Sequence, residues 1–129
     1  MGALKMNVHD SMVVRYSADL ENETFAMYLK PDTEEGVKEV NFEGVLAHWF
    51  ECVASWNVLY DIEELDVKTF TSYFKKVLLE GKSDGWPLFF ETLEDLEEQL
   101  VNKGYKTYYI SGCCGITGFV IAEQVSVKV

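Results

Sequence analysis

Cations are scarce in this sequence. Lysine and arginine together number 11, against 22 aspartate and glutamate residues, which gives a formal net charge of −11. A field of this sign repels phosphate groups, so we expect neither nucleic acid nor a membrane surface as a partner. The same field favours a basic protein as a partner, and it also keeps a protein soluble.

Long apolar runs are missing as well. The sequence has no stretch of about 18 apolar residues, so we expect no transmembrane helix. Residues 1–10 lack the hydrophobic centre of a secretory signal peptide, and Met6 stands where a myristoylation signal requires serine or threonine. We therefore expect a cytoplasmic protein.

Cysteine is rare, with residues only at positions 52, 113 and 114. An odd count without regular spacing argues against a secreted disulfide scaffold. No cysteine pair has the two-residue separation that is typical of structural zinc sites. We therefore expect no disulfide framework, no metal and no cofactor.

Hydrophobic residues, in contrast, make up 48% of the chain, which is enough for a packed core. Without repeats or linkers, the 129 residues fit a single domain, 1–129. Alternation with a period of two predicts strands over 12–20, 24–30 and 57–63. In 12–20 this alternation places the apolar residues at 14, 16, 18 and 20 on one face, and 37–53 is predicted to be two strand segments bent at Gly44.

The second half of the chain changes to a helical period. Asp66 is the predicted N-cap of a helix that ends near Glu80, and Thr92 is the predicted N-cap of a second helix that ends at Gly104. Residues 106–110 and 116–129 are predicted strands around a turn at 112–115. This order predicts an α+β fold, with a mainly antiparallel β-sheet and two helices inserted between N-terminal strands and a C-terminal hairpin.

The segment 84–98 is the candidate surface for a partner. It contains six carboxylates, no lysine or arginine, and an apolar, aromatic stretch at 86–90. Aromatic anchors among charges suit contact with a basic protein. We expect Phe89 and Phe90 to pack beneath the helices, and Trp86 to belong either to the core or to the interface. The candidate partner-binding residues are Asp84, Trp86, Glu91, Glu94, Asp95, Glu97 and Glu98.

The adjacent cysteines offer an alternative, enzymatic interpretation. Cys113 or Cys114 is a possible nucleophile, with His9 or His48 as the base and Asp61 as the group that orients it. No lysine or arginine stands near either cysteine to lower the thiol pKa, so we favour unreactive cysteines in a turn or in the core. The glycines around them suit a hairpin better than a phosphate-binding loop, because no helix follows.

Four carboxylates cluster at Asp61, Glu63, Glu64 and Asp66, which raises the alternative of a divalent-cation site. The run lacks the glycine and the spacing of a calcium loop, so we predict a strand edge that leads into a helix N-cap. We also predict that His48 is a core or half-buried side chain, and that His9 makes local hydrogen bonds where the first strand begins.

Three segments carry a resemblance to other proteins: 9–11 (HDS), 42–45 (FEGV) and 57–63 (NVLYDIE). They resemble a group of small bacterial proteins, some of which look like immunity proteins of polymorphic toxin systems, and the closing hairpin at 109–121 is similar too. The resemblance implies a small, soluble, intracellular α+β protein that acts by binding. It implies no catalytic residue.

We therefore expect a non-enzymatic, protein-binding module, and specifically a toxin-neutralising, immunity-like protein. Two alternatives stay open from the residues alone. One is a small hydrolase-type enzyme or metal-binding protein that uses the cysteine, histidine and aspartate residues. The other is a structural homo-oligomer that associates through its tryptophan-rich face.

Overall fold

The computed structural model of the chain describes residues 8–32 and 36–128. The first part of the chain contains β1 (Met12–Asp19), β2 (Thr24–Lys30), β3 (Lys38–Glu43), β4 (Ala47–Glu51) and β5 (Val58–Leu65). The helices follow as α1 (Val67–Tyr73), α2 (Lys75–Gly81), the 3₁₀ helix η1 (Lys82–Asp84) and α3 (Leu93–Asn102). The chain closes with β6 (Lys106–Cys114), β7 (Thr117–Ala122) and β8 (Gln124–Lys128).

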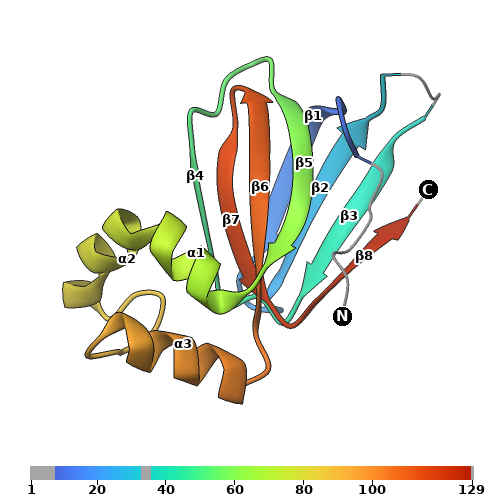
Figure 1. The fold of residues 1–129 in the computed structure, drawn as a ribbon. Helices are drawn as coiled ribbons and strands as arrows, with labels where there is room; N and C mark the ends of the chain where they lie inside the picture. The colour runs from blue at the N-terminus through green and yellow to red at the C-terminus, as the bar shows by residue number, and fades with distance from the viewer. Residues whose placement is uncertain (1–7, 33–35, 129) are drawn as a thin grey trace.

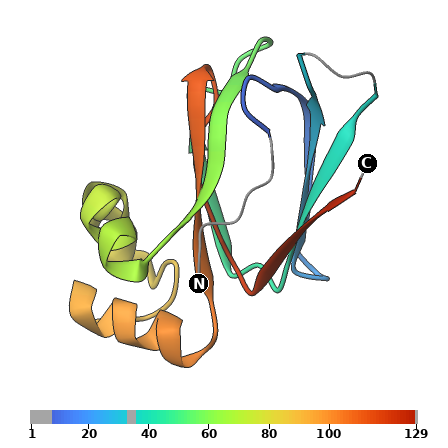
Figure 2. The ribbon, with the colours of Figure 1, turned by 45° about the vertical axis from the view of Figure 1, so that its right-hand side comes forward.

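The strands form one antiparallel sheet in the order β4-β7-β6-β5-β1-β2-β3-β8, folded into two halves that face each other. Figure 2 shows β4-β7-β6-β5 on one side and β1-β2-β3-β8 on the other. The helices lie against the outer face of the first half (Figure 1). The predicted α+β fold with a mainly antiparallel sheet is confirmed, with the helices between the first five strands and the last three.

The two halves meet at two corners. At one, the pairing of β5 with β1 is short: Val58 lies opposite Met12, and the Val13 N–H donates a hydrogen bond of 2.9 Å to the Asn57 carbonyl. At the other, β3 leads through Gly44 into β4, and β7 leads through Glu123 into β8, so that these segments form one long bent ribbon. Gly44 has a φ of 62° and its Cα lies so close to the Glu123 side chain that a Cβ would collide with it. The bend predicted at Gly44 is thus confirmed.

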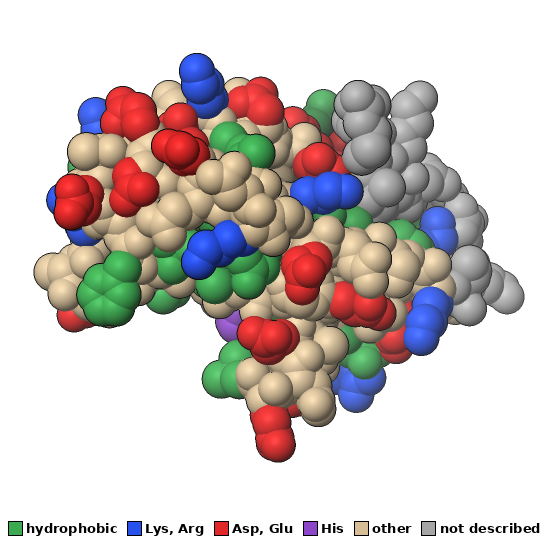
Figure 3. Space-filling model, turned by 90° about the horizontal axis from the view of Figure 1, so that it is seen from below, with side chains coloured by type: hydrophobic (Ala, Val, Ile, Leu, Met, Phe, Trp, Pro, Cys, Tyr) green, Lys and Arg blue, Asp and Glu red, His purple; other side chains and the backbone are tan. Residues whose placement is uncertain are grey.

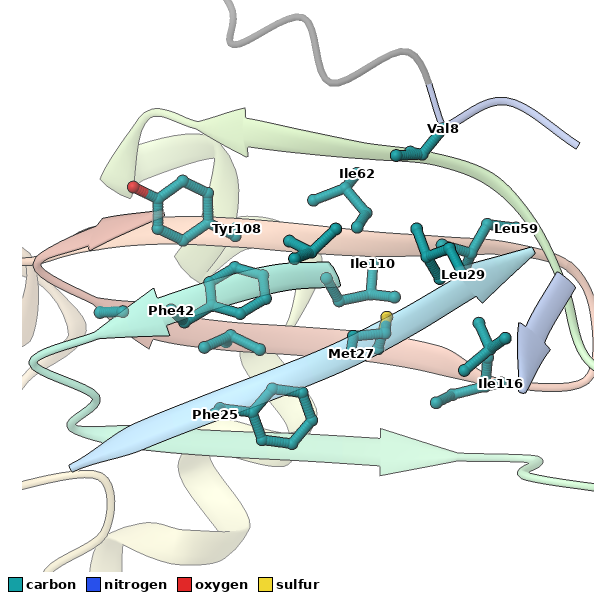
Figure 4. Packing of buried hydrophobic residues seen from close by; sticks show 14 residues of the cluster. Val8, Phe25, Met27, Leu29, Phe42, Leu59, Ile62, Tyr108, Ile110 and Ile116 are labelled. Carbon is teal, nitrogen blue, oxygen red and sulfur yellow. The ribbon is translucent and has the colours of Figure 1, made fainter. Parts of the chain in front are cut away.

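The space between the halves holds the main hydrophobic core (Figure 4). Alternate residues of β2 point inward from one half, and residues of β5 and β6 meet them from the other, as the period of two requires. Burying such side chains stabilises the fold by about 25 cal/mol per Å² of apolar surface. The largest of these fully buried side chains include Phe25, Met27, Leu29, Phe42, Leu59, Ile62 and Tyr108.

The first strand departs from its predicted burial pattern. The residues that alternation groups on one face of 12–20 are exposed, and only Val13 of β1 is buried. Pairing with β2 shifts register between Val13 and Arg15, and beyond Met12 no described strand pairs with the other edge of β1. The bulge and the open edge leave most of β1 in contact with solvent.

A second hydrophobic cluster joins the helices to the sheet. Phe119 and Ile121 of β7 point to this side, while Val120 and Ala122 point into the main core, so β7 is buried on both faces. The predicted helix from 66 to 80 is divided at Phe74, whose φ of −106° and ψ of 23° separate α1 from α2. Phe74 is buried, and its ring centroid lies 5.5 Å from that of Phe70 and 4.8 Å from that of Phe119.

The C-terminal strands also differ in extent from their prediction. β6 continues to Cys114, so the turn to β7 lies at 115–116 and not over 112–115. The strand predicted from 116 onward is divided at Glu123, where the ribbon passes from one half of the sheet to the other. Among the helices within 8–32 and 36–128, none is long and apolar enough to span a bilayer.

Candidate functional site

The aromatic part of the candidate segment 84–98 is divided between core and surface. Trp86 is half-buried, with its ring 5.9 Å from that of Phe119, and Phe90 is buried as predicted. Phe89 is 84% exposed, so its predicted position beneath the helices is wrong. Gln99 Nε2 donates to the Phe89 carbonyl at 2.9 Å, and the Phe89 ring lies against the backbone of Gly85, outside the helical layer.

The carboxylates of α3 have different roles. Asp95 accepts hydrogen bonds from the Glu91 backbone at 2.9 Å and from Gln99 at 3.2 Å, and Glu97 accepts one from the Thr71 hydroxyl of α1. Both therefore have partners inside the helical layer. The other candidate carboxylates are exposed: Asp84, Glu91, Glu94 and Glu98.

The turn between β1 and β2, at the lower end of the sheet in Figure 1, carries a second group of carboxylates. Asp19, Glu21 and Glu23 belong to this turn, and between them Leu20 is 78% exposed. Hydrogen bonds from Asn22 lower the pKa of Asp19 and so favour its charged form. Figure 3 views the molecule from this end and shows carboxylates around exposed hydrophobic side chains.

The turn borders a groove of about 300 Å³, which we call the edge groove. It is formed by the β1–β2 turn, the chain that leads into β4, and Trp86 from the loop before α3. The sequence did not reveal it, because these three segments are distant along the chain. The residues that line it are Ala18, Asp19, Leu20, Glu23, Thr24, Val45, Leu46, Ala47, His48 and Trp86.

His48 lies in this groove and is half-buried, as predicted. Its ring centroid is 5.0 Å from that of Phe25 and 5.8 Å from that of Phe50. Burial lowers the pKa of His48, because the charged imidazolium loses hydration there. The neutral imidazole is therefore the favoured form of this side chain.

A larger groove of about 590 Å³ lies where α1 and α2 meet β4, β6 and β7, and we call it the helix-side groove. Trp49, Tyr73, Phe74 and Tyr109 form its aromatic lining, and the hydroxyls of Tyr73 and Tyr109 lie 3.0 Å apart. Strand pairing places Trp49 of β4 and Tyr109 of β6 on opposite sides of Phe119 of β7. The charged residues of this groove are Glu51, Lys76 and Glu80.

The predicted enzymatic residues are placed in different parts of the molecule. Cys113 lines the helix-side groove, whereas His48 lines the edge groove and Asp61 lines neither. All three cysteines are free and exposed, so none belongs to the core. The hydrogen bond and charge interaction with Cys114 raise the pKa of Cys113, and Asp10 adds to this shift. A raised pKa disfavours the thiolate that nucleophilic catalysis needs.

His9 was predicted to make local hydrogen bonds; it contacts its neighbour Asp10, but its hydrogen bond is to Tyr60, 51 residues later in the chain. Its Nδ1 lies 2.8 Å from the carbonyl oxygen of Tyr60, and its Nε2 lies 3.2 Å from the Asp10 carboxylate. These contacts join the chain before β1 to β5. His9 therefore pairs with Asp10 and not with the predicted Asp61.

The carboxylate run at 61–66 forms the predicted strand and N-cap. Asp66 accepts hydrogen bonds from the backbone and the hydroxyl of Thr69, both at 2.9 Å, and these bonds lower the pKa of Asp66. Asp61 accepts from the backbone of Ile62 at 2.8 Å. Within 8–32 and 36–128, no three histidine, cysteine or carboxylate side chains are grouped so that they could hold a metal ion.

In comparisons with known proteins, no family model, no curated protein and no solved structure matches this chain.

Proposed function

We propose that this protein is a binding module for a basic protein partner. The observation that carries the proposal is the exposure of Leu20 and Phe89, at 78% and 84%, in turns that also hold carboxylates. Leu20 stands between Asp19 and Glu21, and Phe89 stands two residues before Glu91. Exposed apolar anchors surrounded by charges are typical of interfaces in which charge selects the partner.

The net charge supports the same proposal through the rate of association. A protein with a charge of −11 attracts a cationic partner over a distance of about one Debye length, about 8 Å at physiological ionic strength. Steering of this kind raises association rates at low salt and weakens as salt is added. The anchors then hold the partner after the charges have attracted it.

Cross-linked capture from the source cells tests the proposal. We expect the wild-type protein to retain a basic protein, and the double variant Leu20→Ser, Phe89→Ser to retain much less of it. Trp56→Ser is the matched control, because Trp56 is 56% exposed and belongs to the loop between β4 and β5. Recovery of acidic proteins alone, or equal recovery by all variants, would contradict the proposal.

A more specific form of the proposal is that the partner is a basic toxin, which this protein neutralises. The small size of the chain, its acidic charge and the resemblance of its segments 9–11, 42–45 and 57–63 to immunity-like proteins support it. Co-expression with the product of an adjacent toxin-like gene tests it. We expect growth to be rescued by the wild type but not by the Leu20→Ser, Phe89→Ser variant, and failure of the wild type to rescue growth would contradict it.

A further inference from the structure

We propose that the edge groove binds an extended segment that contains lysine or arginine, and that this segment adds as a strand to the free edge of β4. This inference rests on the proposed function and deepens it by assigning a site and a mode of binding. It combines three features of the groove: an open strand edge, apolar walls and an uncompensated negative charge.

The open edge comes from the way the two halves of the sheet meet. In the part of the chain that the structure describes, β4 pairs with β7 alone, and its other edge carries no strand. That edge lies on the side of β1, where the rings of Tyr16 and Phe50 are 5.7 Å apart. An unpaired edge presents backbone N–H and C=O groups that an added strand can bond.

Apolar walls lie beside this edge. Leu20 and Trp86 stand on different segments that line the groove, and Val45, Leu46 and Ala47 belong to the chain that leads into and begins β4. Alternate side chains of an added strand would point toward such walls, because successive residues of a strand face opposite sides. The volume of about 300 Å³ is at the small end of ligand pockets, which suits one or two side chains of a peptide.

Charge decides which segment fits. Asp19 and Glu23 line the groove, and no lysine or arginine is among its lining residues. One further carboxylate, Glu123, lies near: burial, followed by the charges of Glu23 and Glu123, raises the pKa of Tyr105, so both carboxylates act on the same hydroxyl. A cationic side chain that alternates with apolar residues satisfies both the walls and the carboxylates.

The same charge argues against a second copy of this chain as the occupant. Two copies would each carry −11, and the groove of one would face the acidic surface of the other. Like charges brought together across an interface cost free energy. The occupant is therefore a basic segment of a different protein.

A labelled hexapeptide of alternating lysine and valine, measured by fluorescence anisotropy with the whole protein, tests the inference. We expect it to bind, and the matching peptide of glutamate and valine not to bind. A version of the lysine peptide with N-methylated backbone amides keeps the charge but loses backbone donors, so we expect its affinity to fall more than about tenfold. Equal binding of both lysine peptides would overturn strand addition.

Substitutions in the protein test where the peptide binds. Glu23→Gln keeps the size of the side chain and removes its charge, so we expect binding to weaken about threefold, as for a screened ion pair. Glu80→Gln on α2 is the matched control, since Glu80 is an exposed glutamate outside the edge groove, and we expect this variant to bind the peptide like the wild type. Equal weakening by both variants would show diffuse attraction and overturn the site.

Peptide-induced NMR shift changes separate this inference from the proposed function. We expect them at Ala47–Glu51 and around the β1–β2 turn. If capture identifies a basic partner but the shift changes lie elsewhere, the edge-groove inference fails and the proposed function stands. If the peptide binds at the groove but no basic partner is captured, the proposed function fails.

Discussion

The side-chain oxygen of Asn57 accepts a hydrogen bond of 3.0 Å from the backbone N–H of Ile116, 59 residues later in the chain. The same oxygen accepts from the Ala54 backbone at 2.9 Å, and the Asn57 amide donates to the Ala54 carbonyl at 2.7 Å. One buried asparagine thus connects the loop before β5 to the turn between β6 and β7. Backbone groups at both places depend on it, since a buried amide needs a partner.

Asn57→Ala should therefore destabilise the protein by about 2 kcal/mol, because it leaves the buried Ile116 N–H without its acceptor. The free energy of unfolding, from urea denaturation, measures this. Asn102→Ala is the control, since Asn102 is exposed at the end of α3. A loss no larger than that of the control would show that water replaces the amide.

Gly118 allows β7 and β4 to approach each other. A Cβ at this position would collide with the Trp49 carbonyl oxygen and would lie 2.8 Å from the Phe50 Cα. We expect Gly118→Ala to cost about 3 kcal/mol, as for an overpacked core site. Hydrogen exchange should rise selectively in β4, whose only described strand partner is β7.

Gly104→Ala separates that clash from a general effect of losing glycine. Gly104 has a φ of 80°, but a Cβ added to it would meet nothing within 4 Å, so this variant tests the cost of the left-handed conformation alone. We expect it to cost about 1 kcal/mol and to leave exchange in β4 unchanged. Faster exchange in β4 in this variant would argue against the contact between β7 and β4 as the cause.

The raised pKa of Tyr108 predicts that the protein loses stability in alkaline solution. Burial, followed by the charge of Glu64, raises the pKa of Tyr108 from 10.0 to about 12. Between these two pH values the unfolded chain releases the phenolic proton and the folded protein keeps it, so stability falls as the pH rises. Tyr108→Phe keeps the ring and removes the proton, so its unfolding free energy should fall less steeply than that of the wild type. An equal fall of the unfolding free energy with pH in the variant and the wild type would contradict this expectation.

The lowered pKa of His48 predicts that the protein also loses stability as the pH falls. Because burial lowers its pKa, the unfolded chain takes up the proton first as the pH falls through the ordinary value of 6.5. The folded state is then destabilised in proportion to the extra proton that the unfolded state binds. His48→Phe, which retains a ring against Phe25, should lose less stability between neutral and mildly acidic pH. Thermal unfolding at several pH values measures the difference, and an unchanged pH dependence would contradict it.

Local rules predicted the features that depend on a few neighbouring residues. Asp66 and Thr92 were recognisable as N-caps because the acceptor and the N–H group lie within three residues of each other. The bend at Gly44 was recognisable because strand alternation loses its phase there. The candidate segment 84–98 was less predictable, since Phe89 is held against Gln99 and Gly85, and no periodic pattern connects these residues to it.

By itself, the sequence determined the class of fold, the positions of most strands and helix starts, and the excess of negative charge. Only the tertiary structure decided that the sheet folds into two halves, that β7 is buried on both faces, and that Leu20, His48 and Trp86 line one groove. The physical reason is the range of the interactions. Capping and alternation act within a few residues, whereas the edge groove is formed by segments whose order in the sheet depends on core packing between residues far apart in the chain.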